Sequence, residues 1–182
     1  MSKRTIIPLE KLSADTVELY KAVNGESNLA CALICGAALE NALTTLLSRF
    51  FLEDKVSEEA LTNPQGILAS FGSCTDMAYC LGLISKGMHK NLKTIAKIRN
   101  RFAHSHLHIG FGDPEVAKLC NILTLPKIAH QVNVDPDDPR WAENILSTNP
   151  LSRFTFVVCL IHNMIMGTAS SIERQKASNH PW

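Results

Sequence analysis

Residues 27–52 constrain the fold more than any other part of the chain, because they form one long apolar run with almost no charge. Between Ser27 and Ser48 the only charged residue is Glu40. Apolar side chains would cover nearly every side of a helix built from this run, and such a helix is stable only among other helices. The run therefore predicts the central helix of an all-α, single-domain bundle, with Ser27 as its N-cap.

Helix signals recur along the rest of the chain, whereas strand signals are weak throughout. Further helices are expected over 14–23 (N-cap Ser13), within 53–66, and over 73–84 (N-cap Ser73), 88–104, 114–123 (N-cap Asp113) and 151–172. The expected organisation is a lead with a short helix over 1–25, a helical core over 26–124, an irregular Pro-rich arm over 125–150, and a final helix with a polar tail over 151–182 that packs on the core. A hairpin is expected within the arm at 130–134.

The charge of the chain limits the partners it can bind. Its 18 Lys and Arg residues and 17 Asp and Glu residues give a formal net charge of +1. A general coat of positive charge for nucleic acid is therefore excluded, and any nucleic-acid contact must come from a local patch. Aromatic residues make up only 6% of the chain, which is few for a surface on which bases stack.

The six cysteines are expected to be reduced and structural. They lie in apolar helical runs, where a free thiol packs as a small hydrophobic group. The first residues lack the apolar core of a signal peptide, and no two cysteines have the C-x-x-C spacing of a thiolate zinc site. The longest apolar runs, 29–39 and 154–166, are shorter than the ~20 residues that span a membrane. These features predict a soluble, cytoplasmic protein that needs no cofactor.

Residues 98–108 carry the densest set of reactive side chains. Arg99, Asn100 and His104 place a histidine five positions after an arginine. This pattern resembles the Arg-x4–6-His signature of the HEPN superfamily of helical domains, which implies a metal-independent ribonuclease. His104 would act as general acid or base on the ribose 2′-oxygen, and Arg99 would stabilise charge on the phosphate. On an ideal helix, however, the two side chains lie about 140° apart.

A structural role is the alternative for the same arginine. Arg99 projects toward the apolar side of the 88–104 helix, and a buried arginine needs an acidic partner. Glu40, the lone charge in the central helix, is the candidate partner. We therefore expect a buried Glu40–Arg99 ion pair to link the two helices, and we favour this interpretation over the nuclease.

A metal site is a third interpretation of this region. His104, His106 and His108 alternate along the chain and are candidate ligands. Three histidines without an evident carboxylate partner are a weak metal signal. Histidines near the C-terminal end of a helix, where the helix dipole favours positive charge, explain the pattern equally well.

A basic stripe lies on the outer face of the same helix. It comprises Lys90, Lys93, Lys97 and Arg101, with His104 at its end. Cations on one face of a helix usually form a solvated surface. Their functional interpretation is a face for nucleic-acid phosphates or for a partner protein.

Four segments, at 26–40, 71–84, 98–105 and 111–116, stand in an order that resembles the mannitol operon repressor (MtlR) family. The resemblance extends over residues 26–120. It implies an all-helical domain with a role in the transcriptional regulation of sugar-alcohol uptake genes. It implies neither catalytic residues nor a recognised DNA-binding motif, so a protein of this kind would act through another protein.

These observations predict a non-enzymatic transcriptional regulator that works through protein–protein contacts. The alternative is a metal-independent, HEPN-like ribonuclease that uses Arg99 and His104, with Asn100 in support. Direct binding of DNA or RNA by the basic stripe is a weaker third possibility. The high apolar content also favours self-association into a homo-oligomer, and nothing in the sequence indicates a membrane partner.

Overall fold

A computed structural model describes residues 12–105, 109–124, 149–174 and 176. This part of the chain folds into α1 (Ala14–Val23), α2 (Asn28–Phe50), α3 (Lys55–Thr62), α4 (Phe71–Cys80), α5 (Lys86–His104), α6 (Pro114–Asn121) and α8 (Pro150–Ser171). The described residues form no strand, so the prediction of an all-α fold is confirmed. The hairpin expected at 130–134 and the rest of the 125–148 arm lie outside the described residues.

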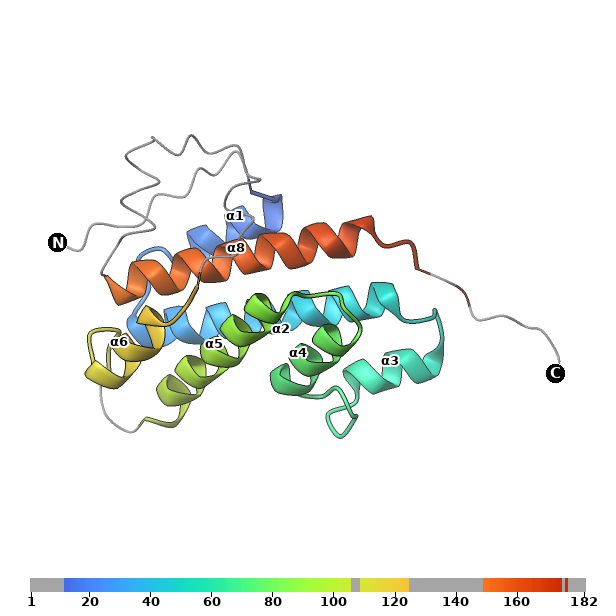
Figure 1. Cartoon of the computed structure of the whole chain (residues 1–182), viewed down its shortest axis with the longest axis horizontal. Coiled ribbons are helices and arrows are strands. Elements are labelled where there is room, and N and C mark those ends of the chain that lie inside the picture. Colours follow the sequence, from blue (N-terminus) through green and yellow to red (C-terminus); the bar gives the residue numbers. More distant parts are fainter. Residues whose placement is uncertain (1–11, 106–108, 125–148, 175, 177–182) are drawn as a thin grey trace.

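Helix α2 occupies the centre of the bundle, as its apolar sequence predicts. In Figure 1, α8 runs along one side of α2, and α4 and α5 lie along the opposite side. Helix α1 packs against both α2 and α8, and α6 packs against α5 and α8. Leu39, Leu43 and Leu46 of α2 are fully buried. The apolar run therefore forms the core between two layers of helices.

Helix starts follow the hydroxyl side chains that can cap them. Ser13 and Ser27 accept from the backbone N–H groups of Thr16 and Ala30, which confirms both predicted N-caps. Helix α4 begins at Phe71 rather than at residue 73, because its N-cap is Ser70 and not Ser73. The two serines bond each other reciprocally in a capping box.

The ends of α4 and α5 also differ from the prediction. Helix α4 stops at Cys80 because Gly82 adopts a positive φ of 72°, a conformation that favours glycine. Helix α5 begins at Lys86 rather than at residue 88, with Ser85 as its N-cap. Gly87 therefore belongs to the first turn of α5 instead of to the connection before it.

Three phenylalanines join α5 to α8. The ring of Phe111, in the turn before α6, lies 4.9 Å from the ring of Phe102 and 5.0 Å from the ring of Phe154, measured between centroids. In the same turn, Asp113 precedes α6 as predicted, but its carboxylate accepts from Gly110 N rather than from the helix. This turn fixes where α6 lies against α5.

A buried hydrogen bond joins α1 to α8. Thr16 Oγ1 lies 2.7 Å from His162 Nδ1, and Ser13 N donates to Asn163 Oδ1 at 2.7 Å. Burial lowers the pKa of His162 below its ordinary value of 6.5. The unfolded chain therefore binds more protons than the folded chain just below that pH. The contribution of His162 to stability is therefore fully present above pH 6.5, and it is lost as the pH falls toward the folded-state pKa of this residue.

We expect Thr16→Val to lower the free energy of unfolding by about 1–3 kcal/mol, because it leaves a buried imidazole nitrogen without its partner. Urea unfolding monitored by circular dichroism measures this loss. Thr45→Val is the matched control, because the Thr45 hydroxyl donates to Asn41 O on the exposed side of α2. The control should change stability by less than about 0.5 kcal/mol. Equal losses in both variants would contradict the role of the buried bond.

All six cysteines are free, as predicted, and only Cys80 is exposed. Burial raises the pKa of the Cys120 and Cys159 thiols to about 12, so both stay protonated. These thiols pack as part of the core.

Two helices of the described chain are long and apolar enough to cross a membrane by length and composition. They are α2 and α8, with 23 and 22 residues. Both helices extend beyond the apolar runs at 29–39 and 154–166, so the shortness of those runs does not by itself exclude a membrane span. Within the fold, 44% and 56% of their most apolar windows are buried, and core helices of soluble bundles pass the same test.

Candidate functional site on helix α5

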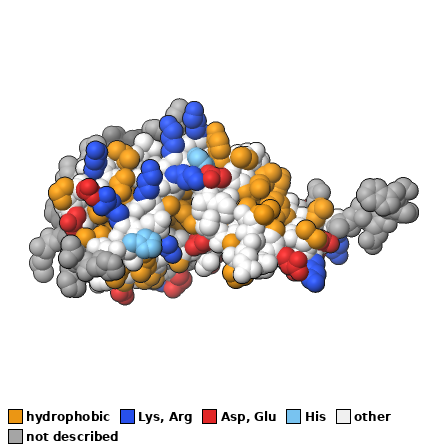
Figure 2. Space-filling view, turned by 90° about the horizontal axis from the view of Figure 1, so that it is seen from below, with side chains coloured by type: hydrophobic (Ala, Val, Ile, Leu, Met, Phe, Trp, Pro, Cys, Tyr) orange, Lys and Arg blue, Asp and Glu red, His pale blue; other side chains and the backbone are white. Residues whose placement is uncertain are grey.

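Helix α5 carries the predicted basic stripe on the face opposite its core residues. Lys90, Lys97, Arg101 and His104 are exposed, whereas the residues toward α2 are buried. Figure 2 shows Lys and Arg side chains gathered over the half of this face that α5 and α6 occupy, with more apolar surface toward α3 and α4. The helical period alone produces this separation of charge from core.

Lys93 differs from the other cations of the stripe, because α4 engages it. Asp76 of α4 accepts from Lys93 Nζ and from His89 Nε2, both at 2.7 Å. These two bonds, the one from Lys93 foremost, hold the pKa of the Asp76 carboxyl below its usual range. The His89 ring also lies against Tyr79, with centroids 4.6 Å apart. Lys93 therefore helps to hold α4 on α5.

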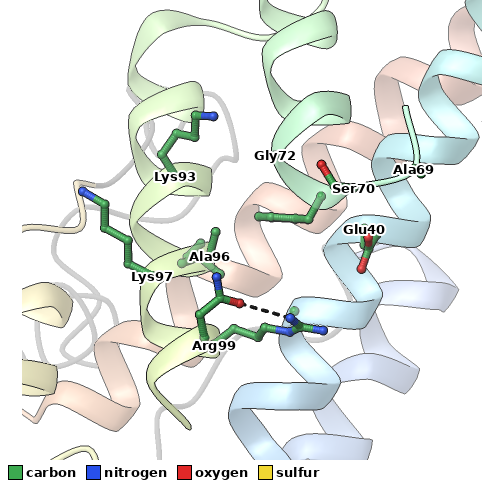
Figure 3. A pocket seen from close by; sticks show the side chains of 12 residues that line it. Glu40, Ala69, Ser70, Gly72, Lys93, Ala96, Lys97 and Arg99 are labelled. Atoms are coloured by element: carbon green, nitrogen blue, oxygen red, sulfur yellow. Dashed lines mark hydrogen bonds between the residues drawn. The ribbon is translucent and has the colours of Figure 1, made fainter. Parts of the chain in front are cut away.

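A groove lies between α2, the start of α4 and α5, and we name it the α2–α5 groove. Its volume is about 670 Å³. Its polar lining comprises Glu40, Ser70, Lys93, Lys97, Arg99 and Asn100. Figure 3 shows Lys93, Lys97 and Arg99 along the α5 wall and Glu40 on α2 across from them.

The predicted burial of Arg99 with Glu40 is wrong. Arg99 is exposed, and its Nη1 donates to Asn100 Oδ1 at 3.0 Å. No ion pair within 4.0 Å joins Arg99 to Glu40 or to any other described carboxylate. The cause is Gly36, which lets the arginine stem lie directly on α2: a Cβ placed on Gly36 would meet Arg99 Cγ at 2.8 Å. The guanidinium of Arg99 therefore enters the groove beside Gly36, which lies one turn of α2 away from Glu40.

A second hollow lies between α5 and α6, and we name it the α5–α6 hollow. Its volume is about 730 Å³. Its lining comprises Lys97, Asn100, Arg101, His104, Glu115, Lys118, Leu119 and Ile122. Arg101 forms an ion pair with Glu115, and Ile122 is 58% exposed. The hollow therefore combines a charged rim with an exposed apolar side chain.

The structure places the two candidate nuclease residues in different hollows. Arg99 lines the α2–α5 groove and His104 lines the α5–α6 hollow, while Asn100 and Lys97 line both. The angular separation along α5 that the sequence indicated is therefore retained. His106 and His108 lie outside the described residues. Within those residues, no group of three His, Cys, Asp or Glu side chains could hold a metal ion.

The start of α4 completes the α2–α5 groove, and α6 completes the α5–α6 hollow. The sequence did not indicate these residues as site residues. Ser70 comes from the start of α4, and Lys118 and Ile122 come from α6 and its C-cap. The spacing of Lys118 and Ile122 places them on one face of a helix. That signal reveals a shared face but not that the face lies beside α5.

Comparison with known proteins finds a fold relative. No protein-family model and no curated protein matches the sequence. Among solved structures, the chain is similar to a chain in the X-ray structure of the MtlR–HPr complex from Escherichia coli, with a TM-score of 0.63 and 20% identity. The similarity covers 85% of this chain and 99% of that chain. At this identity the likeness establishes the fold: the chain has an MtlR-like helical bundle.

Proposed function

We propose that this chain is a non-enzymatic regulator of transcription, resembling the mannitol operon repressor, that acts in the cytoplasm through contacts with another protein. The observation that carries the proposal is the likeness in fold to nearly the whole of an MtlR chain that was solved with HPr bound. A helical bundle that serves as a binding scaffold needs no catalytic residues. HPr is accordingly the first partner to test.

The α5–α6 hollow is the contact surface that we propose. Lys97 and Lys118 on its rim form no ion pair with another described residue, so a partner's acidic groups can meet them without first displacing a bond. Ile122 offers an exposed apolar side chain beside them. A partly apolar centre with a charged rim is the usual anatomy of a protein–protein interface.

The state of the basic stripe favours a protein partner over direct binding of DNA. Asp76 engages Lys93 and Glu115 engages Arg101, so a nucleic acid would meet two acidic groups within the stripe. The formal net charge of +1 adds little attraction at long range. Both features weaken the electrostatic contribution on which phosphate contacts depend.

Titration calorimetry of the full chain with purified E. coli HPr tests the proposal. We expect the unmodified chain to bind HPr. The double variant Lys97→Glu with Lys118→Glu should bind about tenfold or more weakly, because it replaces the positive charges of the rim with negative charges that repel the acidic groups of the partner. The matched control is Lys21→Glu with Lys55→Glu, a double reversal of exposed lysines on α1 and α3. The control should bind as the unmodified chain does.

Two results would contradict these statements separately. If the unmodified chain gives no binding heat with HPr, HPr is not the partner. If both double variants bind as well as the unmodified chain, the contact surface lies elsewhere than in the α5–α6 hollow.

A further inference from the structure

The α2–α5 groove has the dimensions of a small-molecule site and shares only Lys97 and Asn100 with the lining of the proposed protein contact. Its volume of about 670 Å³ falls within the usual range for pockets that bind organic ligands. Buried Gly36 and Ile95 are part of its lining, and polar side chains come from α2, from α5 and from Ser70, the N-cap of α4. Arg99 and Glu40 line this groove and not the α5–α6 hollow. The two sites can therefore be tested by different substitutions.

The α5 wall of the groove is rich in hydrogen-bond donors with positive charge. Lys97 forms no ion pair with another described residue. Arg99 Nη1 donates to Asn100 Oδ1, and the other N–H groups of its planar guanidinium form no bond with another described residue, so they are available to a ligand. Lys93, held by Asp76, adds a third positive charge. A doubly charged oxyanion is the ligand group that such a set binds best, and the guanidinium matches a phosphate with two parallel bonds.

The α2 wall carries the opposite chemistry. Glu40 is half-buried, and its carboxylate forms no hydrogen bond or ion pair with another described residue. A carboxylate accepts hydrogen bonds and repels anions. A ligand that fills the groove must therefore present its anionic group to α5 and hydrogen-bond donors without negative charge to Glu40.

We propose that the α2–α5 groove binds a phosphate monoester of a polyhydroxy compound. Arg99 and Lys97 hold the phosphate, and Glu40 accepts from the hydroxyl groups at the other end of the ligand. Gly36 serves this site because its missing side chain lets the Arg99 stem lie on α2 and brings the guanidinium to the same face as Glu40, one turn away.

Calorimetric titration of the full chain with glucose 6-phosphate, inorganic phosphate and glucose tests the proposal. We expect glucose 6-phosphate to bind with a Kd below about 1 mM, and inorganic phosphate to bind about tenfold more weakly because it makes no contact with Glu40. Glucose alone should not bind measurably. Glu40→Ala should reduce the preference for the ester over inorganic phosphate, because it removes both the acceptor and the repulsion.

Arg99→Met keeps an unbranched stem over Gly36 and removes the donors, so it should weaken binding of the ester by about tenfold or more. Arg49→Met is the matched control, because Arg49 is exposed near the end of α2 and lines neither hollow. The control should bind as the unmodified chain does. The proposal is overturned if the unmodified chain binds neither phosphate compound, if the ester binds no better than inorganic phosphate, or if Arg99→Met binds the ester unchanged.

Discussion

Phe154→Ala is expected to lower the free energy of unfolding by about 3–5 kcal/mol. Phe154 is fully buried on α8, and its ring contacts Phe111, which in turn contacts Phe102 of α5. Removing the ring loses the free energy gained by burying it and leaves a cavity beside Phe111. The substitution should therefore also loosen the turn that places α6 beside α5. Urea unfolding measures the stability, and amide exchange of residues 109–124 measures the loosening.

The control for this loss is the same substitution at a phenylalanine that the core does not enclose. Phe50, at the end of α2, is 42% exposed. Phe50→Ala should cost less than about 1.5 kcal/mol, because much of its surface is already in water. A loss as large at Phe50 as at Phe154 would mean that the aromatic contacts between α5 and α8 contribute nothing specific to stability.

Gly36→Ala is expected to lower the free energy of unfolding by about 1–3 kcal/mol, although alanine favours a helix by about 1 kcal/mol over glycine. The added methyl group would meet Arg99 Cγ at 2.8 Å, so either the arginine stem or the spacing of α2 and α5 must change. The middle of a side chain that lies along a helix cannot move away freely. Close packing of the two helices therefore outweighs helix propensity at this residue.

A double-mutant cycle tests that cause. Arg99→Ala removes the clashing Cγ and leaves Cβ 3.4 Å from the added methyl group, an ordinary contact distance. In this background Gly36→Ala should become neutral or stabilising by up to about 1 kcal/mol. Gly167→Ala is the matched control, because Gly167 lies within α8 with nothing within 4 Å of an added Cβ. It should stabilise the unmodified chain. If Gly36→Ala is tolerated as well as Gly167→Ala, Arg99 does not pack on Gly36 as described.

Much of the fold could be predicted because its signals are local. Helix α1 begins and ends where Ser13 and the Asn24-Gly25 pair indicate, and the apolar run of α2 requires a central position. The start of α4 was placed wrongly because Ser70 and Ser73 are both good N-cap residues. Only the reciprocal bonds between them decide which one caps, and local sequence does not contain that geometry.

The candidate site could be predicted only in part, for a related reason. The exposed face of α5 follows from its helical period. The bonding partner of Arg99 does not follow from that period. Whether the guanidinium bonds Glu40, Asn100 or water depends on how closely α2 approaches α5. Gly36 sets that approach. The α5–α6 hollow likewise depends on the turn at 109–113, which the pairing of Phe111 with two distant rings holds in place.

Hydrogen–deuterium exchange of the full chain, with and without HPr, tests most directly whether this bundle is a scaffold that presents α5 and α6 to a protein partner. We expect HPr to slow exchange in Lys86–His104 and Pro114–Asn121, and to leave Ala14–Val23 and Lys55–Thr62 unchanged. Slower exchange in α1 or α3, with none in α5 and α6, would contradict the proposed surface.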